Sequence, residues 1–536
     1  MITKSIDAIS RKKAAQLCLE QLADPEYSVM QPLWELCDDV FRGELAVKAK
    51  DNKYIYRPKS KQGVTRGKAW EAYKGRGKLP DFAAKTLNKM CGILSSAPAE
   101  IRLDGKAAIL GFMREYATPY HDGLDSMAGR VREHILRSGR YCLLLEPDQD
   151  ESIGFHINEY KCRKFLRAKA VSNGGETYAK LVLLDTSCIV YDTSLWRDVY
   201  YPQITLLALD ENERYYQARF GENGAVIDRY TNAGNPVYAN EKEYARTMGK
   251  VFASLESFNV DKPDESKCTE LIYPTKYGRT LNRIPFVCIN PADMNFTDYR
   301  NPPLLNLCLQ SIHILNADCD HQTAIFLTTD PIAVFKGVTK KDNMTLSSDI
   351  PVFIEKDANF MFVSPSGVGL DMQKQNIAEM KEEAREMGVS LAGQEGAGNT
   401  PVGTMQLYRN SQTADLMRIN QNVGKAIENI LRFAGRWLGM SDEETARDIH
   451  FTPSDAFAEI KATAQECAML AASSAELQMT DEEVRKFIEK NGLAEPRPWE
   501  EVKRELEKEK AEKAERGLNS VAKVFGFSER DAGSTD

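Results

Sequence analysis

The chain has 536 residues, of which 42% are hydrophobic and 28% are charged, and its formal net charge is −8. These values are typical of a globular protein with two or more structural units, and they argue against a protein that grips nucleic acid over a broad basic face. No apolar run approaches the length of a transmembrane helix, and the first residues lack the apolar core of a secretory signal. We therefore expect no membrane partner.

Eleven cysteines are spread along the chain, and none forms a CxxC pair. Most stand within apolar runs such as RYCLLLEP, FVCIN and LNLCLQ. This pattern indicates buried free thiols in a reducing cytoplasm rather than disulfides.

The first hundred residues are predicted to be helical, with one interruption at residues 53–78. That stretch holds nine Lys or Arg and a single acid, Glu71. Aromatic residues are interleaved with the basic ones, namely Tyr54, Tyr56, Trp70 and Tyr73. Such a segment is a phosphate or nucleic-acid contact, a solvated arm, or a contact to an acidic neighbouring subunit. The candidate residues for either kind of contact are Arg57, Lys59, Lys61, Arg66 and Lys68.

The next segments predict a helix followed by a β region. Met127, Val131 and Ile135 recur at helical spacing, Gly139 can end the helix, and a buried strand follows at 141–145. Residues 150–290 then contain short apolar and aromatic runs joined by turn sequences such as DENE and GENG. This indicates a mostly antiparallel sheet or small barrel.

A strand is predicted at Ile284–Ile289, and a helix of about 25 residues after Pro302 and Pro303, because proline is tolerated at a helix start. The first half of this helix is apolar and should be buried. Residues 328–370 form a small insert with three strand candidates, IAVFKGV, IPVFIEK and NFMFVS.

Two further helices carry apolar seams at spacings of three and four residues. The seam of the first, residues 371–391, consists of Ile377, Met380, Ala384, Met387 and Leu391. The seam of the second, which runs to about Leu438, consists of Leu416, Ile419, Val423, Ile427, Ile430, Ala434 and Trp437. Gly439 can end the second helix, and Ser441–Glu444 has the pattern of a capping box.

The segment between these helices, residues 392–403, has a single charged residue, Glu395. Its glycines are Gly393, Gly396, Gly398 and Gly403. Glycine gives the backbone many accessible conformations. The segment is therefore either a functional loop or an unusually long connection between helices.

The remainder predicts a strand in HFTPSDAFAEI, a second capping box at Thr480–Glu483 and a charged helical C-terminus. No GxSxG, HExxH or kinase motif is present. GVTRGKA has the wrong glycine spacing for a phosphate-binding loop. His313, Cys319, Asp320 and His321 are the only local group of metal-type ligands, and polar residues at a subunit contact explain them better. We expect no catalytic residue, no metal and no cofactor.

The order of these elements resembles that of the portal proteins of tailed bacteriophages. The resemblance is clearest from Arg283 to Gly439, in RIPFVCIN, NPPLLNLCLQSIHILNADCDH, DPIAVFKG, QNIAEMKEEAREMGVSL and QTADLMRINQNVGKAIENILRFAGRWLG. HILRSGRYCLLLEP and FTPSDAFAEI fit more loosely. Residues 150–270 depart from the family pattern.

The resemblance implies an α+β portal-type fold with a helical stem, a β-containing wing and clip, and a helical C-terminal crown. Residues 1–302 would form the wing, 303–327 a stem helix, 328–370 the clip, 371–391 a second stem helix, 392–403 the tunnel loop, 404–474 the long helix with its return to the wing, and 475–536 the crown with a flexible C-terminus. The DNA-channel residues would be Gly393, Gln394, Glu395, Gly396, Ala397, Gly398, Asn399 and Thr400.

The family's function would be a ring, usually of twelve subunits, at one capsid vertex of the virion. It would be assembled in the host cytoplasm and would conduct DNA during packaging and ejection. Implied partners are further copies of the chain, the terminase large subunit, head-completion or adaptor proteins, major capsid and scaffolding proteins, and double-stranded DNA. Two other functions stay open at this point, a nucleic-acid-processing enzyme that uses residues 53–78 and a minor capsid protein without a channel.

Overall fold

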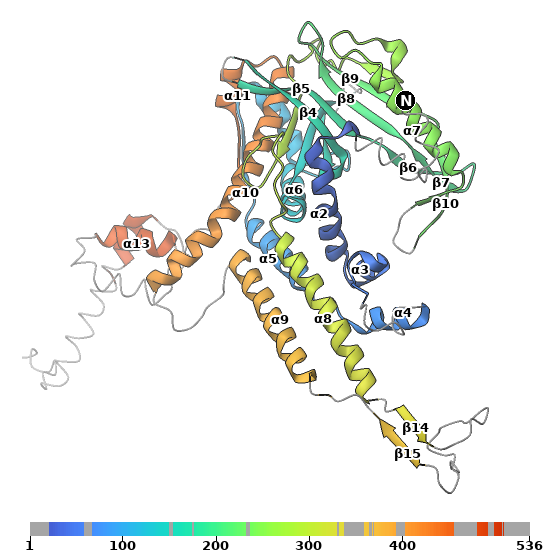
Figure 1. Ribbon diagram of the computed structural model, residues 1–536. Coiled ribbons are helices and arrows are strands. Elements are labelled where there is room, and N and C mark those ends of the chain that lie inside the picture. Colours follow the sequence, from blue (N-terminus) through green and yellow to red (C-terminus); the bar gives the residue numbers. More distant parts are fainter. Residues whose placement is uncertain are drawn as a thin grey trace, which may run out of the picture. The chain divides into compact units, whose positions relative to one another are not determined.

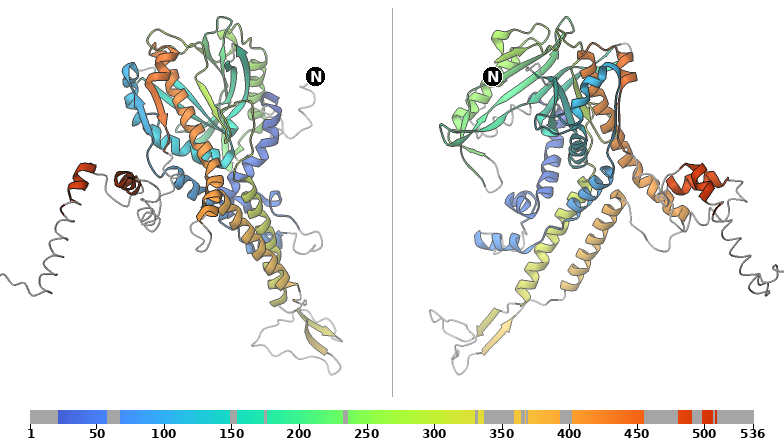
Figure 2. Two further views of the ribbon diagram at one scale, coloured as in Figure 1. Left: turned by 90° about the vertical axis from the view of Figure 1, so that its left-hand side faces the viewer. Right: turned by 180° about the vertical axis from the view of Figure 1, so that it is seen from behind.

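The structure is a computed structural model that describes residues 21–57, 67–148, 154–173, 176–231, 236–329, 332–336, 359–363, 367, 369–392, 402–454, 480–490, 498–505 and 508. The chain forms two compact units, Met1–Phe457 and Ala458–Asp536. Helices and strands are both abundant (Figures 1 and 2), so the predicted α+β class is confirmed. Among the described residues, no helix has the length and apolar character that crossing a membrane requires.

The first unit begins with helices α2 (Pro25–Arg42), α3 (Glu44–Ala49), α4 (Gly67–Arg76) and α5 (Phe82–Leu94). Proline stands in the first turn of α2, where its missing N–H costs no hydrogen bond. Gly43 ends α2 with a φ of +98°, a conformation that favours glycine. Trp34 anchors α2 in the interior with 1% exposure.

Helix α6 (Leu124–Ser138) leads into a three-stranded sheet ordered β13-β2-β3. Its strands are β2 (Tyr141–Pro147), β3 (Phe155–Lys161) and β13 (Phe286–Ile289). Gly139 lies in the left-handed region with a φ of +71° and ends α6, as predicted. A 3₁₀ helix, η5 (Gly105–Arg114), precedes α6, and β1 (Glu100–Leu103) precedes η5.

Strands between residues 165 and 272 form two antiparallel sheets around the predicted turns. The five-stranded sheet is ordered β12-β9-β8-β5-β4, with bounds β4 (Phe165–Asn173), β5 (Glu176–Asp185), β8 (Gln203–Leu209), β9 (Tyr215–Gly221) and β12 (Glu270–Ile272). The four-stranded sheet is ordered β11-β10-β7-β6, with bounds β6 (Cys188–Asp192), β7 (Arg197–Tyr201), β10 (Ala225–Tyr230) and β11 (Pro236–Tyr238).

Two features of this region differ from a simple meander. Strand β10 follows β9 in sequence but pairs with β7 and β11, so the GENG turn connects two sheets. Helix α7 (Glu241–Glu256) was not predicted, although Asn240 caps it by accepting hydrogen bonds from the backbone N–H groups of Lys242 and Glu243.

Helix α8 (Leu305–Thr329) has the predicted 25 residues and position. Its first half is buried, as its apolar composition indicated, with Leu307, Cys308 and Leu315 at 0% exposure. Strands β14 (Ile332–Lys336) and β15 (Asn359–Val363) pair in antiparallel register and confirm two of the three strand candidates in the insert. The third candidate, IPVFIEK, lies outside the described residues.

Helix α9 (Leu370–Ala392) confirms the next predicted helix, and α10 (Val402–Trp437) confirms the long one. All seven predicted seam residues of α10 are buried. Gly439 follows with a φ of +80°, and Ser441 and Glu444 form the predicted capping box at the start of α11 (Asp442–Asp448). Strand β16 (Ile449–Thr452) then pairs with β1, which brings the end of this unit beside the segment before η5.

The interior of the first unit is one large apolar cluster to which α5, α6, α8, α10 and the three-stranded sheet contribute. A smaller cluster lies between α2, α7 and the five-stranded sheet. In the second unit, α13 (Asp481–Lys490) begins after Thr480, whose hydroxyl accepts from the Glu483 N–H while the Glu483 carboxylate accepts from the Thr480 N–H. This confirms the second capping box.

Candidate functional surfaces

Helices α8 and α9 lie side by side, with the β14–β15 hairpin at one end of the pair (Figures 1 and 2). The Gln310 amide of α8 donates to the Glu383 carboxylate of α9 at 2.9 Å and to the Met380 carbonyl at 3.3 Å. Ile377 and Ala384, both from the predicted seam, are buried. Part of the predicted seam therefore packs within the subunit.

The exposed side of α9 separates its charges into two stripes. At 100° per residue, Glu379, Glu382 and Glu386 project in neighbouring directions, whereas the basic residues of the helix project from another side. The ion pair between Arg385 and Glu382 has both side chains 60% exposed, so it contributes little stability. One long edge of α9 thus presents carboxylates to its surroundings.

The predicted DNA-channel residues Gly393–Thr400 lie outside the described residues. The structure gives the two ends of this segment, because α9 ends at Ala392 and α10 begins at Val402. With Pro401, the segment thus makes up the connection between the two helices, and its role in a channel stays a prediction.

Of the five basic candidates, Arg57 and Lys68 are described and exposed, and Lys59, Lys61 and Arg66 lie outside the described residues. The Arg57 guanidinium lies over the Trp70 ring, 4.8 Å from its centroid. Trp70 itself stacks on Tyr73 with centroids 5.5 Å apart. The structure brings Arg57 next to α4, which carries Lys68.

Most aromatic residues of this basic stretch belong to the interior. Tyr54, Trp70 and Tyr73 are buried, and only Tyr56 is exposed. The Tyr73 hydroxyl donates to Asp320 of α8 at 2.9 Å. A polyanion would therefore meet charges here, but few rings on which bases could stack.

The docking of this stretch on α8 also explains the group of metal-type residues. A Cβ on Gly77 would lie 2.3 Å from the Cys319 sulfur, so the chain passes directly over Cys319. Asp318 and Asp320 accept hydrogen bonds from Lys78 N–H and Tyr73. Cys319 and Asp320 thus contact a segment of the same subunit, and for His313 and His321 the contact between subunits stays a prediction. Within the described part of the chain, no group of three such residues could hold a metal ion.

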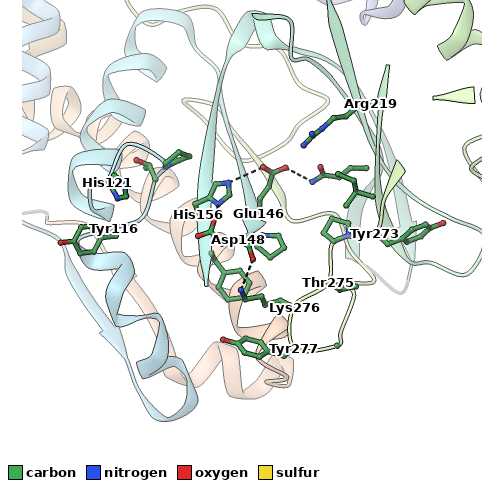
Figure 3. A pocket seen from close by; sticks show the side chains of 18 residues that line it. Tyr116, His121, Glu146, Asp148, His156, Arg219, Tyr273, Thr275, Lys276 and Tyr277 are labelled. Atoms are coloured by element: carbon green, nitrogen blue, oxygen red, sulfur yellow. Dashed lines mark hydrogen bonds and ion pairs between the residues drawn. The ribbon is translucent and has the colours of Figure 1, made fainter. Parts of the chain in front are cut away.

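Sequence reasoning missed a cleft of about 1280 Å³ in the first unit. Its walls come from the turn after η5, the adjoining ends of β2 and β3, the middle of β9 and the loop after β12 (Figure 3). Tyr116, Phe155, Tyr273 and Tyr277 give it an aromatic lining, and Tyr116 and Tyr277 are exposed at its rim. These residues come from five separate segments, so no local motif could have revealed them.

His156 stands in this cleft between two carboxylates. Its Nδ1 lies 2.8 Å from Asp148 Oδ1, and its Nε2 lies 3.6 Å from Glu146 Oε2. The Glu146 carboxylate raises the pKa of His156 against the opposing effect of burial. Burial would raise the pKa of Glu146, but the nearby His156 ring and a hydrogen bond from Gln217 keep that pKa below its ordinary value.

The contacts of His156 hold parts of the cleft wall together, and the arrangement is not that of a catalytic centre. Both ring nitrogens of His156 face acids, so neither is free to take a proton from a substrate. The Lys276 ammonium donates to the Asp148 carbonyl at 3.0 Å and ties the loop after β12 to the end of β2 (Figure 3). The polar groups thus fix the walls of the cleft to one another.

A family model described as a domain of unknown function, DUF4055, matches residues 303–438, the span from α8 to the end of α10. The structure is also similar to a chain from "Neck of native GTA particle computed with C12 symmetry", at 10% identity and a TM-score of 0.35, over 83% of this chain and 98% of that chain. A chain from "Neck of empty GTA particle computed with C6 symmetry" gives 11% and 0.35 over the same shares. A chain from "Virion of native gene transfer agent (GTA) particle" gives 11% and 0.33, over 82% and 94%. No curated protein matches the chain.

Proposed function

We propose that this chain is the subunit of a portal ring at one vertex of a phage-like head, through which double-stranded DNA passes. One observation carries the proposal. Two long helices, α8 and α9, pack side by side, a β-hairpin lies at one end of the pair, and α10 follows α9 after a glycine-rich connection. This is the order of stem, clip, stem, tunnel loop and long helix that the portal resemblance implies.

The charges of the stem suit a conduit. Each contact between a cationic side chain and a phosphate strengthens DNA binding, and firm binding would impede sliding. Helix α8 carries no Lys or Arg, and α9 presents Glu379, Glu382 and Glu386 along one edge. We propose that carboxylates of this kind line part of the channel and keep DNA from adhering to it.

The tunnel loop is assigned to residues 392–403, with Gly393–Thr400 nearest the DNA. Glycine lets each copy adopt its own backbone conformation. Copies around a ring could then adjust separately to a duplex whose helical symmetry does not match theirs. The single charge of the loop, Glu395, adds weak repulsion rather than attachment.

The remaining parts take the other roles of a portal. The hairpin β14–β15 belongs to the clip, which would meet the terminase large subunit and later the head-completion or adaptor proteins. Residues 1–302 would form the wing, facing major capsid and scaffolding proteins, and residues 475–536 the crown. The ring, with twelve copies, would be assembled in the host cytoplasm and retained in the virion.

Electron microscopy of the purified full-length protein, with its mass measured by light scattering, tests this function. We expect rings with an axial hole of roughly 20 Å or more, wide enough for duplex DNA. Closed particles without a hole would favour a minor capsid protein. A protein that stays monomeric at high concentration and cleaves DNA would overturn the proposal in favour of a nucleic-acid-processing enzyme.

A further inference from the structure

The hairpin formed by β6 and β7 exposes an unusual number of apolar side chains. Ile189, Val190 and Tyr191 on β6 are each about half exposed. The turn between the strands adds Leu195 at 52% exposure and Trp196 at 75%. Contiguous exposed apolar groups of this kind mark interaction sites on folded proteins.

The turn holds Leu195 and Trp196 in one arrangement. Asp192 Oδ1 accepts hydrogen bonds from the N–H groups of Ser194 at 2.8 Å and Leu195 at 3.1 Å, and from the Ser194 hydroxyl at 2.5 Å. Trp196 has a φ of +51°, a conformation that side-chain-bearing residues rarely adopt. The hydrogen bonds around Asp192 stabilise this conformation, so the indole is presented with little conformational freedom to lose on binding.

Strand β6 is also the outer strand of its sheet, paired on one side with β7. Edge strands are commonly protected by charges, proline or a covering element. The sequence of β6, Cys-Ile-Val-Tyr-Asp, has one charge at its end. The hairpin thus combines exposed apolar side chains with an unpaired strand edge.

The cleft around His156 has the complementary properties. Its aromatic lining can receive an indole, and its volume of about 1280 Å³ exceeds the volume of a Trp and a Leu side chain together. Its carboxylates, Glu146 and Asp148, suit a cation. Arg197 follows Trp196 directly, is 53% exposed and has only a 3.7 Å contact with Asp228.

Within one copy, the hairpin does not occupy the cleft. Trp196 is 75% exposed, and the residues that line the cleft include none from β6, β7 or the turn between them. The hairpin and the cleft of a copy are thus both left open to contacts with other copies.

We propose that the tip of the β6–β7 hairpin, Leu195 and Trp196, inserts into the cleft of a second copy of this chain, with Arg197 directed at Glu146 and Asp148. The contact joins two different surfaces, so it is heterologous and extends from copy to copy until a ring closes. Trp and Arg at the centre of an interface commonly supply most of its binding energy. This inference rests on the proposed ring and identifies the contact that builds it.

Two variants of the full-length protein test the contact. Trp196→Ala removes the anchor, and Thr275→Trp places a bulky ring in the cleft, where Thr275 is exposed. Loss of an interface anchor of this kind weakens association by about 30-fold or more. Each variant alone should therefore be monomeric, while their equimolar mixture should give dimers, because one intact hairpin meets one intact cleft. Val29→Ser, a change at an exposed residue of α2, should leave the rings intact.

A photo-crosslinking amino acid at position 196 gives a second readout that does not depend on disrupting assembly. Crosslinked peptides should map to residues 116–121 or 272–278 of another copy. If wild-type protein forms rings and Trp196→Ala forms them equally well, or if the crosslinks map elsewhere, the inference is overturned while the ring stands. If wild-type protein forms no ring at any concentration, the proposed function fails as well.

Discussion

At the scale of single residues, His156 makes the stability of the fold depend on pH. Its pKa is raised in the folded protein, so the fold favours the protonated ring. The resulting stability is fully present below the ordinary histidine pKa of about 6.5, and it is lost as the pH rises through the raised value. Such a group therefore stabilises the protein in acid rather than in base.

We expect His156→Gln to lower the free energy of unfolding by about 1 kcal/mol near pH 5.5. At a pH above the raised pKa of His156 the effect should be smaller, because the wild-type ring is then neutral. Urea denaturation of both proteins on either side of that pKa measures the difference. His313→Gln, on the exposed side of α8, serves as the control for the loss of a histidine ring. An equal loss at both pH values would mean that the ring acts through packing alone.

Arg140 makes a different kind of contact, with its guanidinium 1% exposed. The group lies between the rings of Phe165 and Tyr299, 4.1 and 3.9 Å from their centroids. It also donates to the Phe296 carbonyl and, at 3.2 Å, to the Cys288 sulfur. A flat cation is thus enclosed by two rings and ties β2 to the loop before α8.

Arg140→Ala should destabilise the protein by about 3 kcal/mol or more. Arg140→Lys should recover little of this loss, since an ammonium cannot stack between two rings as a guanidinium does. Thermal unfolding measures both, with Arg385→Ala on the exposed face of α9 as the control, expected within about 0.5 kcal/mol of wild type. Full recovery by lysine would show that charge, not shape, is what matters at this position.

At the scale of elements, the sequence predicted the features that depend on residues close together in the chain. The seams of α9 and α10, the glycine that ends α6 and the capping boxes at Ser441 and Thr480 depend on residues within a few positions of one another. Helix α7 was not predicted, although Asn240 is a suitable cap, because the sequence around α7 indicated β-strands. The sheet to which β10 belongs depends on partners far away in sequence, and so do the walls of the cleft.

The basic stretch shows why a pattern of residue types can mislead. Its interleaved aromatic residues suggested a surface for nucleic acid. Tyr73 instead attaches α4 to α8, and sequence alone gives no sign that Asp320 lies within hydrogen-bonding distance. Burial of an aromatic residue depends on the partner helix, which is more than 200 residues away in the chain.

Two helical glycines provide a prediction at this scale. A Cβ on Gly424 of α10 would lie 2.5 Å from the Pro453 ring, whereas a Cβ on Gly249 of α7 would meet nothing within 4 Å. Alanine is the better helix former by about 1 kcal/mol. Gly249→Ala should therefore raise the stability by roughly that amount.

Gly424→Ala should lower the stability by about 1–3 kcal/mol, because the segment after β16 must move away. Paired denaturation curves of the two variants measure the contrast. If both variants gain stability, α10 and the segment after β16 are not in close contact. If both lose it, the helix of α7 is not regular at Gly249.

At the scale of the whole molecule, we expect the predicted tunnel loop to be needed for DNA transport but not for assembly of the ring. Deletion of residues 393–399 should leave rings intact by electron microscopy and abolish DNA packaging. Replacing Glu395 and Asn399 with lysine should also preserve the rings, but it should make them retain DNA in a salt-dependent way, because each new cation can bind a phosphate. Retention measured at low and high salt tests this. Rings that fail to form after the deletion would assign the loop to assembly.

Strands β14 and β15 are joined to helices α8 and α9, and this arrangement determines how a force on the hairpin would be transmitted. In the proposed ring, a motor that docks on this hairpin would pull or twist it. Helices α8 and α9 leave the hairpin side by side, so a pull along their axes divides between them and loads their shared seam in shear, where all its contacts resist together. The two helices would thus transmit force from the motor to the buried first half of α8 without being pulled apart from each other.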